Sequence, residues 1–249
     1  MLEFSYLLNI VMLTRLLYGL KDRPVTAKKT VLVICLQIAL LFPFKLSPAL
    51  FILLILIVLL NIWIYYSEAK TKNLNSFRAL SIIAFIIVTS IFTSPAVNIK
   101  FNYSLIPFFN VLKNYSSILA GINKSNVLEI SFIITGILLV LNESNFVIRY
   151  LFSLFNLLPM LKKKENEENE ELDNIEYNAG RIIGMLERII IFFLVIAGQF
   201  TAIGLVIAAK GFTRFKELED RQFAEYVLVG TFLSAIFSIA VAVIIKSCI

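Results

Sequence analysis

The sequence has no histidine and only two cysteines, Cys35 and Cys248. Without histidine it cannot build a Ser-His-Asp triad, a histidine-ligated haem or most zinc sites, and two cysteines do not make a disulfide framework. Nine glycines and six prolines are too few for a collagen-like or low-complexity chain. We therefore expect no catalytic residue, no metal site and no cofactor, although a membrane enzyme that uses Glu, Lys or a Ser-Lys pair stays open.

Charged residues are also scarce: they make up 16% of the chain, against 59% hydrophobic residues, and the mean hydropathy is +0.87. Such a composition excludes an ordinary water-soluble globule and an intrinsically disordered chain. One helical crossing of a bilayer takes about 20 mostly apolar residues. The sequence therefore predicts an all-α, polytopic membrane protein with six to seven transmembrane helices and the lipid bilayer as its immediate partner.

Seven stretches of the chain are apolar enough to be candidate spans. They are residues 2–20, 30–44, 49–66, 79–93, 127–141, 182–209 and 223–245. The first is interrupted by Glu3, Asn9 and Arg15, so an amphipathic helix on the membrane surface is an alternative there. Residues 104–122 repeat apolar side chains in a polar setting, which favours an amphipathic or re-entrant segment. Residues 146–161 either prolong the preceding helix or lie along the surface.

A charged segment, residues 162–178, divides the chain. It begins with three lysines, and seven acidic residues follow them. Because like charges repel, we expect an extended, solvated linker there. The linker separates an N-terminal membrane region, residues 1–161, from a C-terminal transmembrane hairpin module, residues 179–249. It is also the place where we expect a cytoplasmic partner protein to bind.

The net charge of +6 has a topological explanation. The basic residues are spread over every loop, as the positive-inside rule and anionic headgroups require, so we expect no nucleic acid as a partner. If every candidate span crosses, the loops at 21–29, 70–78 and 162–181 lie in the cytoplasm. The basic residues from Lys210 to Arg221 would then lie outside, against the rule, unless residues 146–161 also cross.

Charged and polar residues within the C-terminal module are the candidate functional residues, because charge at membrane depth is costly. They are Arg181, Gly184, Glu187, Arg188, Gln199, Lys210, Arg214 and Glu225. If 182–209 is one helix, its two charged ends lie roughly 33 Å apart and could form the two mouths of a pathway or anion sites, with Gln199 between them. The alternatives are structural: Glu225 pairs with Lys210 or Arg214 across the hairpin, or the charges reach the headgroups.

Several short motifs in this module also resemble a known family. The resemblance lies in the run from Asn178 to Arg188 and in Gly198-Gln199, Ala208-Ala209-Lys210, Arg214-Phe215, Glu225-Tyr226, Gly230-Thr231 and Ser234. These residues resemble the C-terminal module of an uncharacterised family of bacterial multi-pass inner-membrane proteins, a domain of unknown function. The similarity covers about Asn178 to Ser234, and Asn145 to Arg149 is faintly similar.

The resemblance implies a bacterial cytoplasmic membrane location and supplies no activity. Members of that family begin with helices rich in His and Asp and have a lysine-serine pair where this chain has Lys210-Gly211. No metal or acid-base role of that first part therefore carries over to this chain, which lacks histidine.

Three function classes remain. The first is a membrane subunit, sensor or effector module that acts through a partner or by forming a homo-oligomer, which the small residues Gly180 and Gly184 would permit. The second is an anion or small-solute transporter or channel that uses the charged residues of the C-terminal hairpin. The third is a membrane enzyme, for which no nucleophile motif is present. We favour the first.

Overall fold

The computed structural model describes residues 1–19, 25–70, 74–102, 124–155, 167–213 and 221–249. Over these residues the chain is helical and forms no β-strand, apart from an isolated bridge between Phe44 and Phe101. The prediction of an all-α protein is thus confirmed. The chain divides into two compact units, one from Met1 to Leu138 that also takes in Ile249, and one from Leu139 to Cys248.

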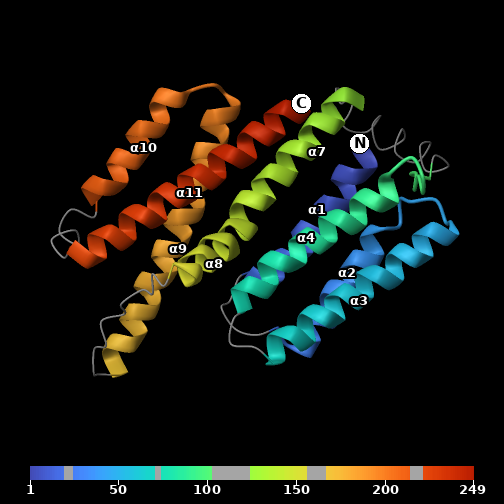
Figure 1. Ribbon diagram of the computed structural model, residues 1–249, viewed down its shortest axis with the longest axis horizontal. Coiled ribbons are helices and arrows are strands. Elements are labelled where there is room, and N and C mark those ends of the chain that lie inside the picture. Colours follow the sequence, from blue (N-terminus) through green and yellow to red (C-terminus); the bar gives the residue numbers. More distant parts are fainter. Residues whose placement is uncertain (20–24, 71–73, 103–123, 156–166, 214–220) are drawn as a thin grey trace, which may run out of the picture. The chain divides into compact units, whose positions relative to one another are not determined.

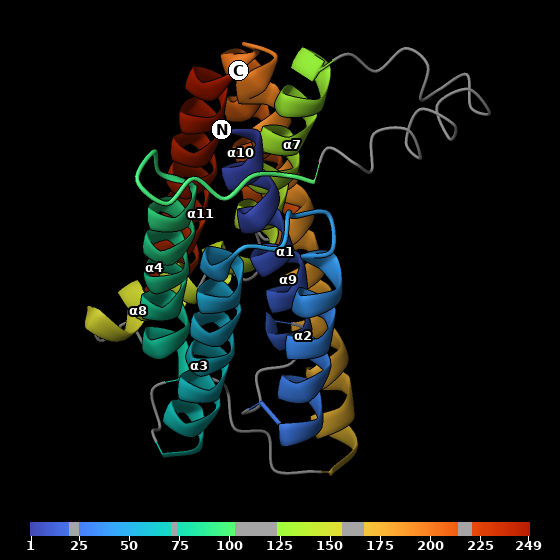
Figure 2. The same cartoon turned by 90° about the vertical axis from the view of Figure 1, so that its right-hand side faces the viewer.

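The first unit consists of five helices. They are α1 (Leu2–Gly19), α2 (Ala27–Leu40), α3 (Pro48–Lys70), α4 (Leu74–Thr93) and α7 (Lys124–Leu138). Helix α1 contacts α2, α4 and α7, and α3 lies between α4 and α2 (Figures 1 and 2). Side chains of α1 such as Leu7, Val11, Met12 and Arg15 are buried against these neighbours. Helix α1 is therefore packed against three helices of the bundle, and a crossing by residues 2–20 stays a prediction.

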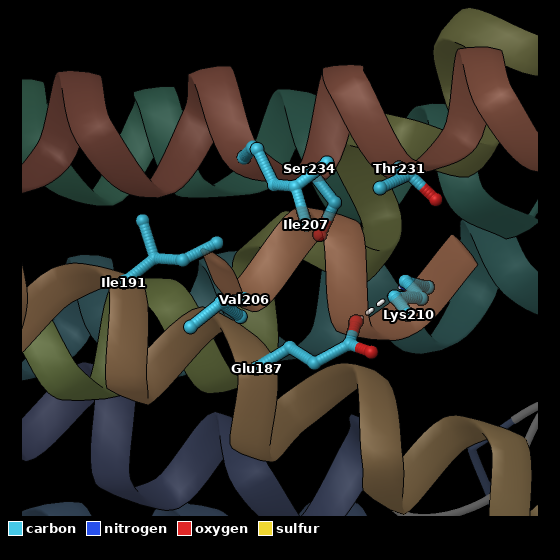
Figure 3. A pocket seen from close by; sticks show the side chains of 8 residues that line it. Glu187, Ile191, Val206, Ile207, Lys210, Thr231 and Ser234 are labelled. Carbon is cyan, nitrogen blue, oxygen red and sulfur yellow. Dashed lines mark hydrogen bonds and ion pairs between the residues drawn. The ribbon is translucent and has the colours of Figure 1, made fainter. Parts of the chain in front are cut away.

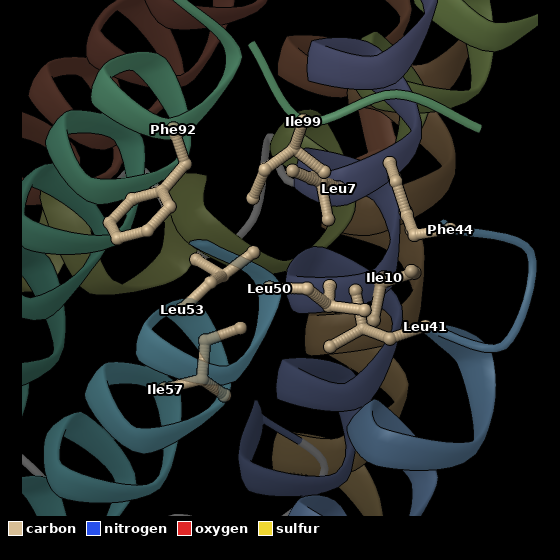
Figure 4. Packing of buried hydrophobic residues seen from close by; sticks show 9 residues of the cluster. All are labelled: Leu7, Ile10, Leu41, Phe44, Leu50, Leu53, Ile57, Phe92 and Ile99. Carbon is tan, nitrogen blue, oxygen red and sulfur yellow. The ribbon is translucent and has the colours of Figure 1, made fainter. Parts of the chain in front are cut away.

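An apolar cluster holds α1 against α3 and against the segments that follow α2 and α4 (Figure 4). Its members come from five places in the chain, so it fixes the order of the bundle. They are Leu7, Ile10, Leu41, Phe44, Leu50, Leu53, Ile57, Phe92 and Ile99. The backbone supports the same arrangement, because the amide of Lys45 donates to the carbonyl of Lys100 and that of Asn102 to Pro43.

Polar side chains also connect the helices of the first unit. Gln37 of α2 donates to the hydroxyl of Thr14 in α1 at 2.8 Å, and Asn61 of α3 donates to the Gln37 carbonyl oxygen at 2.7 Å. All three side chains are buried. A buried amide without a partner costs about 1–3 kcal/mol, so this chain of hydrogen bonds selects one register of three helices.

Three charged residues are buried in the same unit. The guanidinium of Arg78 (α4) makes a two-point ion pair with the carboxylate of Glu68 (α3) at 2.7 and 3.0 Å, and Glu68 also accepts the amide of Val25 at 3.0 Å. Arg15 of α1 donates to the Ser81 hydroxyl and to the Arg78 carbonyl. Charge buried in this way is tolerated only when it is paired and hydrogen-bonded.

The second unit begins with a π-helical turn, η2 (Leu139–Glu143), which continues directly into α8 (Ser144–Leu154). Residues 146–154 therefore prolong the preceding helix, one of the two alternatives left open by the sequence. Three helices follow: α9 (Glu167–Ile196), α10 (Phe200–Thr213) and α11 (Arg221–Cys248). Helix α11 contacts α9, α8 and η2, and α10 contacts α9 (Figure 1).

Four helical segments in the described residues are long and apolar enough to cross a membrane, and this identifies a membrane protein. They are Pro48–Lys70, Ser76–Thr93, Asn126–Leu154 and Ala224–Cys248. They include the ranges 49–66, 79–93, 127–141 and most of 223–245 expected from the sequence. Of the range 30–44, only the part to Leu40 is helical in α2. The segment 104–122 lies outside the described residues.

Two expectations about the C-terminal region are wrong. Residues 182–209 do not form one helix, because α9 ends at Ile196 and α10 begins at Phe200. Nor is 162–178 an extended linker throughout, because α9 already begins at Glu167. The boundary between the compact units also lies upstream of that segment, between Leu138 and Leu139.

Candidate functional site

The turn between α9 and α10 reverses the chain and so decides which charges meet. Gly198 has a φ of +74°, a left-handed conformation that glycine adopts without strain. Its amide donates to the Val195 carbonyl at 3.0 Å, and the amide of Gln199 donates to Leu194 at 2.8 Å. These two hydrogen bonds are the Schellman pattern that ends a helix at a glycine. Helix α10 therefore returns alongside α9 instead of continuing it.

This reversal brings Lys210 of α10 to Glu187 of α9, where their side chains form an ion pair (Figure 3). Each side chain is only 17% exposed. The two residues are 23 positions apart, and a single straight helix would have separated them by roughly 34 Å. The hypothesis of two charge layers at opposite mouths is thus wrong, because the layers coincide.

A small cavity lies beside the ion pair. Thr231 and Ser234 of α11 line it together with the two charged residues, and aliphatic side chains close the remaining sides (Figure 3). Its volume of about 10 Å³ is about that of one water molecule. The cavity can therefore hold a water between the charges and the two hydroxyls. A second cavity, of about 40 Å³, also borders Lys210 and Thr231 and is otherwise lined mainly by apolar side chains.

Arg188, the next residue along α9, is held by the π-helical turn. Its Nε donates to the Val140 carbonyl at 3.0 Å, and its Nη2 donates to the Asn145 side-chain oxygen at 2.8 Å. A π-turn widens the helix by one residue and shifts its carbonyls away from their usual partners, which lets Val140 accept a bond from outside. Arg188 is only 5% exposed. The turn and the guanidinium thus lock α9 to the helix that contains η2 and α8.

Arg181 and Gly184 lie on the same face of α9 as Arg188, at helical spacing. Arg181 is half-buried, and its Nε is buried without a hydrogen-bond partner. A Cβ built on Gly184 would lie 3.7 Å from Nη1 of Arg188, which is an ordinary contact distance. Nη1 of Arg188, the nitrogen that bonds to neither Val140 nor Asn145, therefore lies on the side of this glycine.

Of the remaining sequence-predicted residues, Gln199 lies away from this cluster. Gln199 is exposed in the α9–α10 turn and is not a polar position in the middle of a span. Lys246, near the end of α11, lies beside this turn and donates to the Val195 carbonyl at 3.5 Å. Glu225 is exposed near the start of α11. Arg214 lies outside the described residues.

Sequence reasoning missed the partners of the charged residues. Nothing in the sequence marks the π-turn, and Asn145 was noticed only for a faint family resemblance. Thr231 and Ser234 lie at helical spacing on α11, but this pattern also fits ordinary helix packing. In the described part of the chain, no three His, Cys, Asp or Glu side chains lie close enough to hold a metal ion.

The strength of the Glu187–Lys210 pair can be measured by charge reversal. We expect Lys210→Glu to lower the free energy of unfolding by about 2 kcal/mol, between the values for exposed and fully buried pairs, because it puts two carboxylates together. The swapped double variant, Glu187→Lys with Lys210→Glu, should recover most of this loss. Thermal unfolding in detergent, followed by size-exclusion chromatography, measures both. Lys70→Glu, at an exposed position, is the control, and a double variant no more stable than Lys210→Glu would contradict the pairing.

Comparison with protein-family models, with curated proteins and with solved structures finds no match for this chain.

Proposed function

We propose that the chain is a bacterial inner-membrane module without chemistry of its own, a subunit, sensor or effector that acts through a partner protein or by self-association. One observation supports the proposal: two of the charges that a transport pathway would use are bonded to each other. Glu187 and Lys210 form an ion pair, and the cavity beside them has about the volume of one water. This pairing favours a structural role for the two charges over a pathway for an anion or small solute.

The membrane topology follows from the reversal between α9 and α10. Helices α2 and α10 each have 14 residues, or about 21 Å, which is short for a bilayer core of about 30 Å, but α10 differs from α2 because it returns alongside α9 towards the side where α9 begins. We infer that α1, α2, α3, α4, the α7–α8 helix and α11 cross the membrane, giving six crossings. The α9–α10 hairpin enters and leaves on one side.

This topology removes the conflict with the positive-inside rule. The basic residues from Lys210 to Arg221 now lie on the same side as the loops at 21–29 and 70–78 and the charged segment 162–178. Lys45 and Lys100 lie on the other side, where basic residues are few. The rule then assigns the basic side to the cytoplasm.

Cysteine labelling tests the topology. Single cysteines at Lys70, Asn169 and Arg214, on a background without Cys35 and Cys248, should react with a membrane-impermeant maleimide only from the cytoplasmic side. Lys45→Cys should react from the opposite side. Labelling of Asn169→Cys and Arg214→Cys from opposite sides would contradict the hairpin.

Reconstitution tests the function. Liposomes that contain the purified chain should release chloride no faster than empty liposomes. In the native membrane, a photo-crosslinking amino acid at Asn169 should give a discrete cross-linked species. That species should disappear when the seven acidic residues between 165 and 176 are changed to Gln or Asn. Chloride flux that falls in Lys210→Ala would instead support transport.

A further inference from the structure

We propose that Arg181 and Arg188, with the bare backbone of Gly184 between them, bind the phosphate of an anionic lipid headgroup. The three residues follow each other at i, i+3 and i+7 on one face of α9, a spacing that brings side chains to the same side of a helix. The inference concerns a different ligand from the partner protein proposed above. It uses the proposed topology only to choose the leaflet.

Arg188 supplies a fixed donor. Its Nε and Nη2 are bonded to Val140 and Asn145, so the guanidinium plane is held in place within a side chain that is 5% exposed. Its Nη1 makes no hydrogen bond to a described residue and faces the Cα of Gly184. A guanidinium that is already oriented loses little conformational freedom when it binds a phosphate oxygen.

Arg181 supplies the second donor. Its Nε is buried and has no hydrogen-bond partner, the only such side-chain atom among the described residues. An unpaired buried N–H group of this kind costs about 1–3 kcal/mol, and more on a charged group, so a ligand that accepts its proton would be stabilising. Phosphate oxygens are the acceptors that match guanidinium donors best.

The charge balance also points to an anion. Among the described residues no carboxylate forms an ion pair with Arg181 or Arg188, although the Glu187 carboxylate, which is paired with Lys210, also attracts Arg188 through its charge. One described carboxylate is thus shared between Lys210 and Arg188, which leaves an excess of positive charge on this stretch of α9. At the cytoplasmic end of a membrane helix the most abundant anions are lipid phosphates.

The proposed place of the site favours a lipid over free phosphate. Arg188 reaches from α9 to the helix that contains η2 and α8, so the site lies between two helices near the proposed cytoplasmic end of α9. The exposed side chains of Ile182, Ile183, Leu186 and Ile190 lie on the opposite face of α9 and do not line it. Basic pockets between helices on the cytoplasmic side are the usual places where anionic headgroups bind.

Lipid titration of the full chain tests the inference. The protein, purified in a neutral maltoside detergent, is titrated with phosphatidylglycerol, phosphatidylcholine and inorganic phosphate, and bound ligand is counted by native mass spectrometry. We expect phosphatidylglycerol to bind most tightly. Arg181→Gln should weaken its binding about tenfold, the effect of one charge-assisted hydrogen bond. Gly184→Leu should also weaken it, because the added side chain fills the space beside Nη1 of Arg188.

Two control variants separate the site from general effects. Lys70→Gln removes an equal charge from an exposed position on the same proposed side and should change binding less than about twofold. Gly184→Ala adds only a Cβ, 3.7 Å from Arg188, and should fold and bind nearly as the wild type does.

Two further outcomes would contradict the proposed lipid site. Equal binding of phosphatidylglycerol by Arg181→Gln and Lys70→Gln would overturn the site. Tight binding of inorganic phosphate that is lost in Arg181→Gln would keep the phosphate site and overturn the lipid as its source. Lipid binding does not depend on the cross-linking or labelling results, so the two proposals fail separately.

Discussion

Arg78→Ala is expected to lower the free energy of unfolding by about 3–5 kcal/mol, the usual cost of removing one partner from a buried ion pair. Glu68 and Arg78 are each 2% exposed. The guanidinium of Arg78 donates two hydrogen bonds to the Glu68 carboxylate, with donor–acceptor distances of 2.7 and 3.0 Å. Without the guanidinium, the Glu68 carboxylate stays buried with the amide of Val25 as a neutral donor. Because Arg15 bonds to the Arg78 carbonyl, the change also loosens the contact between α1 and α4.

A double variant distinguishes the ion pair from the loss of side-chain packing. Glu68→Met with Arg78→Met removes both charges and keeps long side chains, and such replacements are often neutral or stabilising. We therefore expect it to be more stable than Arg78→Ala. Unfolding by SDS titration measures the stability of each protein, and Lys70→Ala, at an exposed position of α3, is the control. If Arg78→Ala and Lys70→Ala unfold at the same SDS concentration, the buried pair does not stabilise the bundle.

Arg188→Met should have the second large effect. We expect it to lower the free energy of unfolding by about 3 kcal/mol, through loss of contacts at the π-turn. The change removes two hydrogen bonds from a charged donor, at about 1.5–3 kcal/mol each. The lower end of this range applies because the Val140 carbonyl keeps the Ser144 hydroxyl as a donor and Asn145 is only partly buried. Arg188→Lys should recover only part of the loss, because a single ammonium group does not reproduce the fork of a guanidinium.

Hydrogen exchange shows where the loss occurs. Amides of Leu139–Glu143 should exchange faster in Arg188→Met, because local opening requires less free energy there. Amides of α3, in the other compact unit, should exchange as in the wild type. Unchanged exchange over the π-turn, in a variant that folds, would show that Arg188 does not stabilise it.

The apolar helices were the most predictable part of the fold. Four of the expected spans fall within helices that are long and apolar enough to cross a membrane. They were found because a long unbroken run of apolar residues has few other stable conformations than a helix, and the run in α3 up to Leu60 is the plainest example. Polar residues inside α1, such as Asn9, obscured a helix whose polar groups are bonded within the bundle, here to Ser131 of α7.

The candidate site was predicted as a set of residues and not as an arrangement. Arg181, Glu187, Arg188 and Lys210 were selected because charge is costly in a bilayer. Their partners were not, because residues 182–209 were expected to form one helix that continues through Gly198. A glycine followed by a polar residue is a weak signal for a helix end, and the surrounding apolar residues outweighed it.

The sequence by itself determined that this is a helical membrane protein and which of its residues are too costly to bury without a partner. Composition decides this, because transfer to lipid depends on each side chain almost independently of its neighbours. Only the tertiary structure decided that Glu187 meets Lys210, that Arg188 binds a π-turn and that Glu68 pairs with Arg78. These pairings depend on where a helix ends and on which faces pack, and both are decided by small free-energy differences between distant residues.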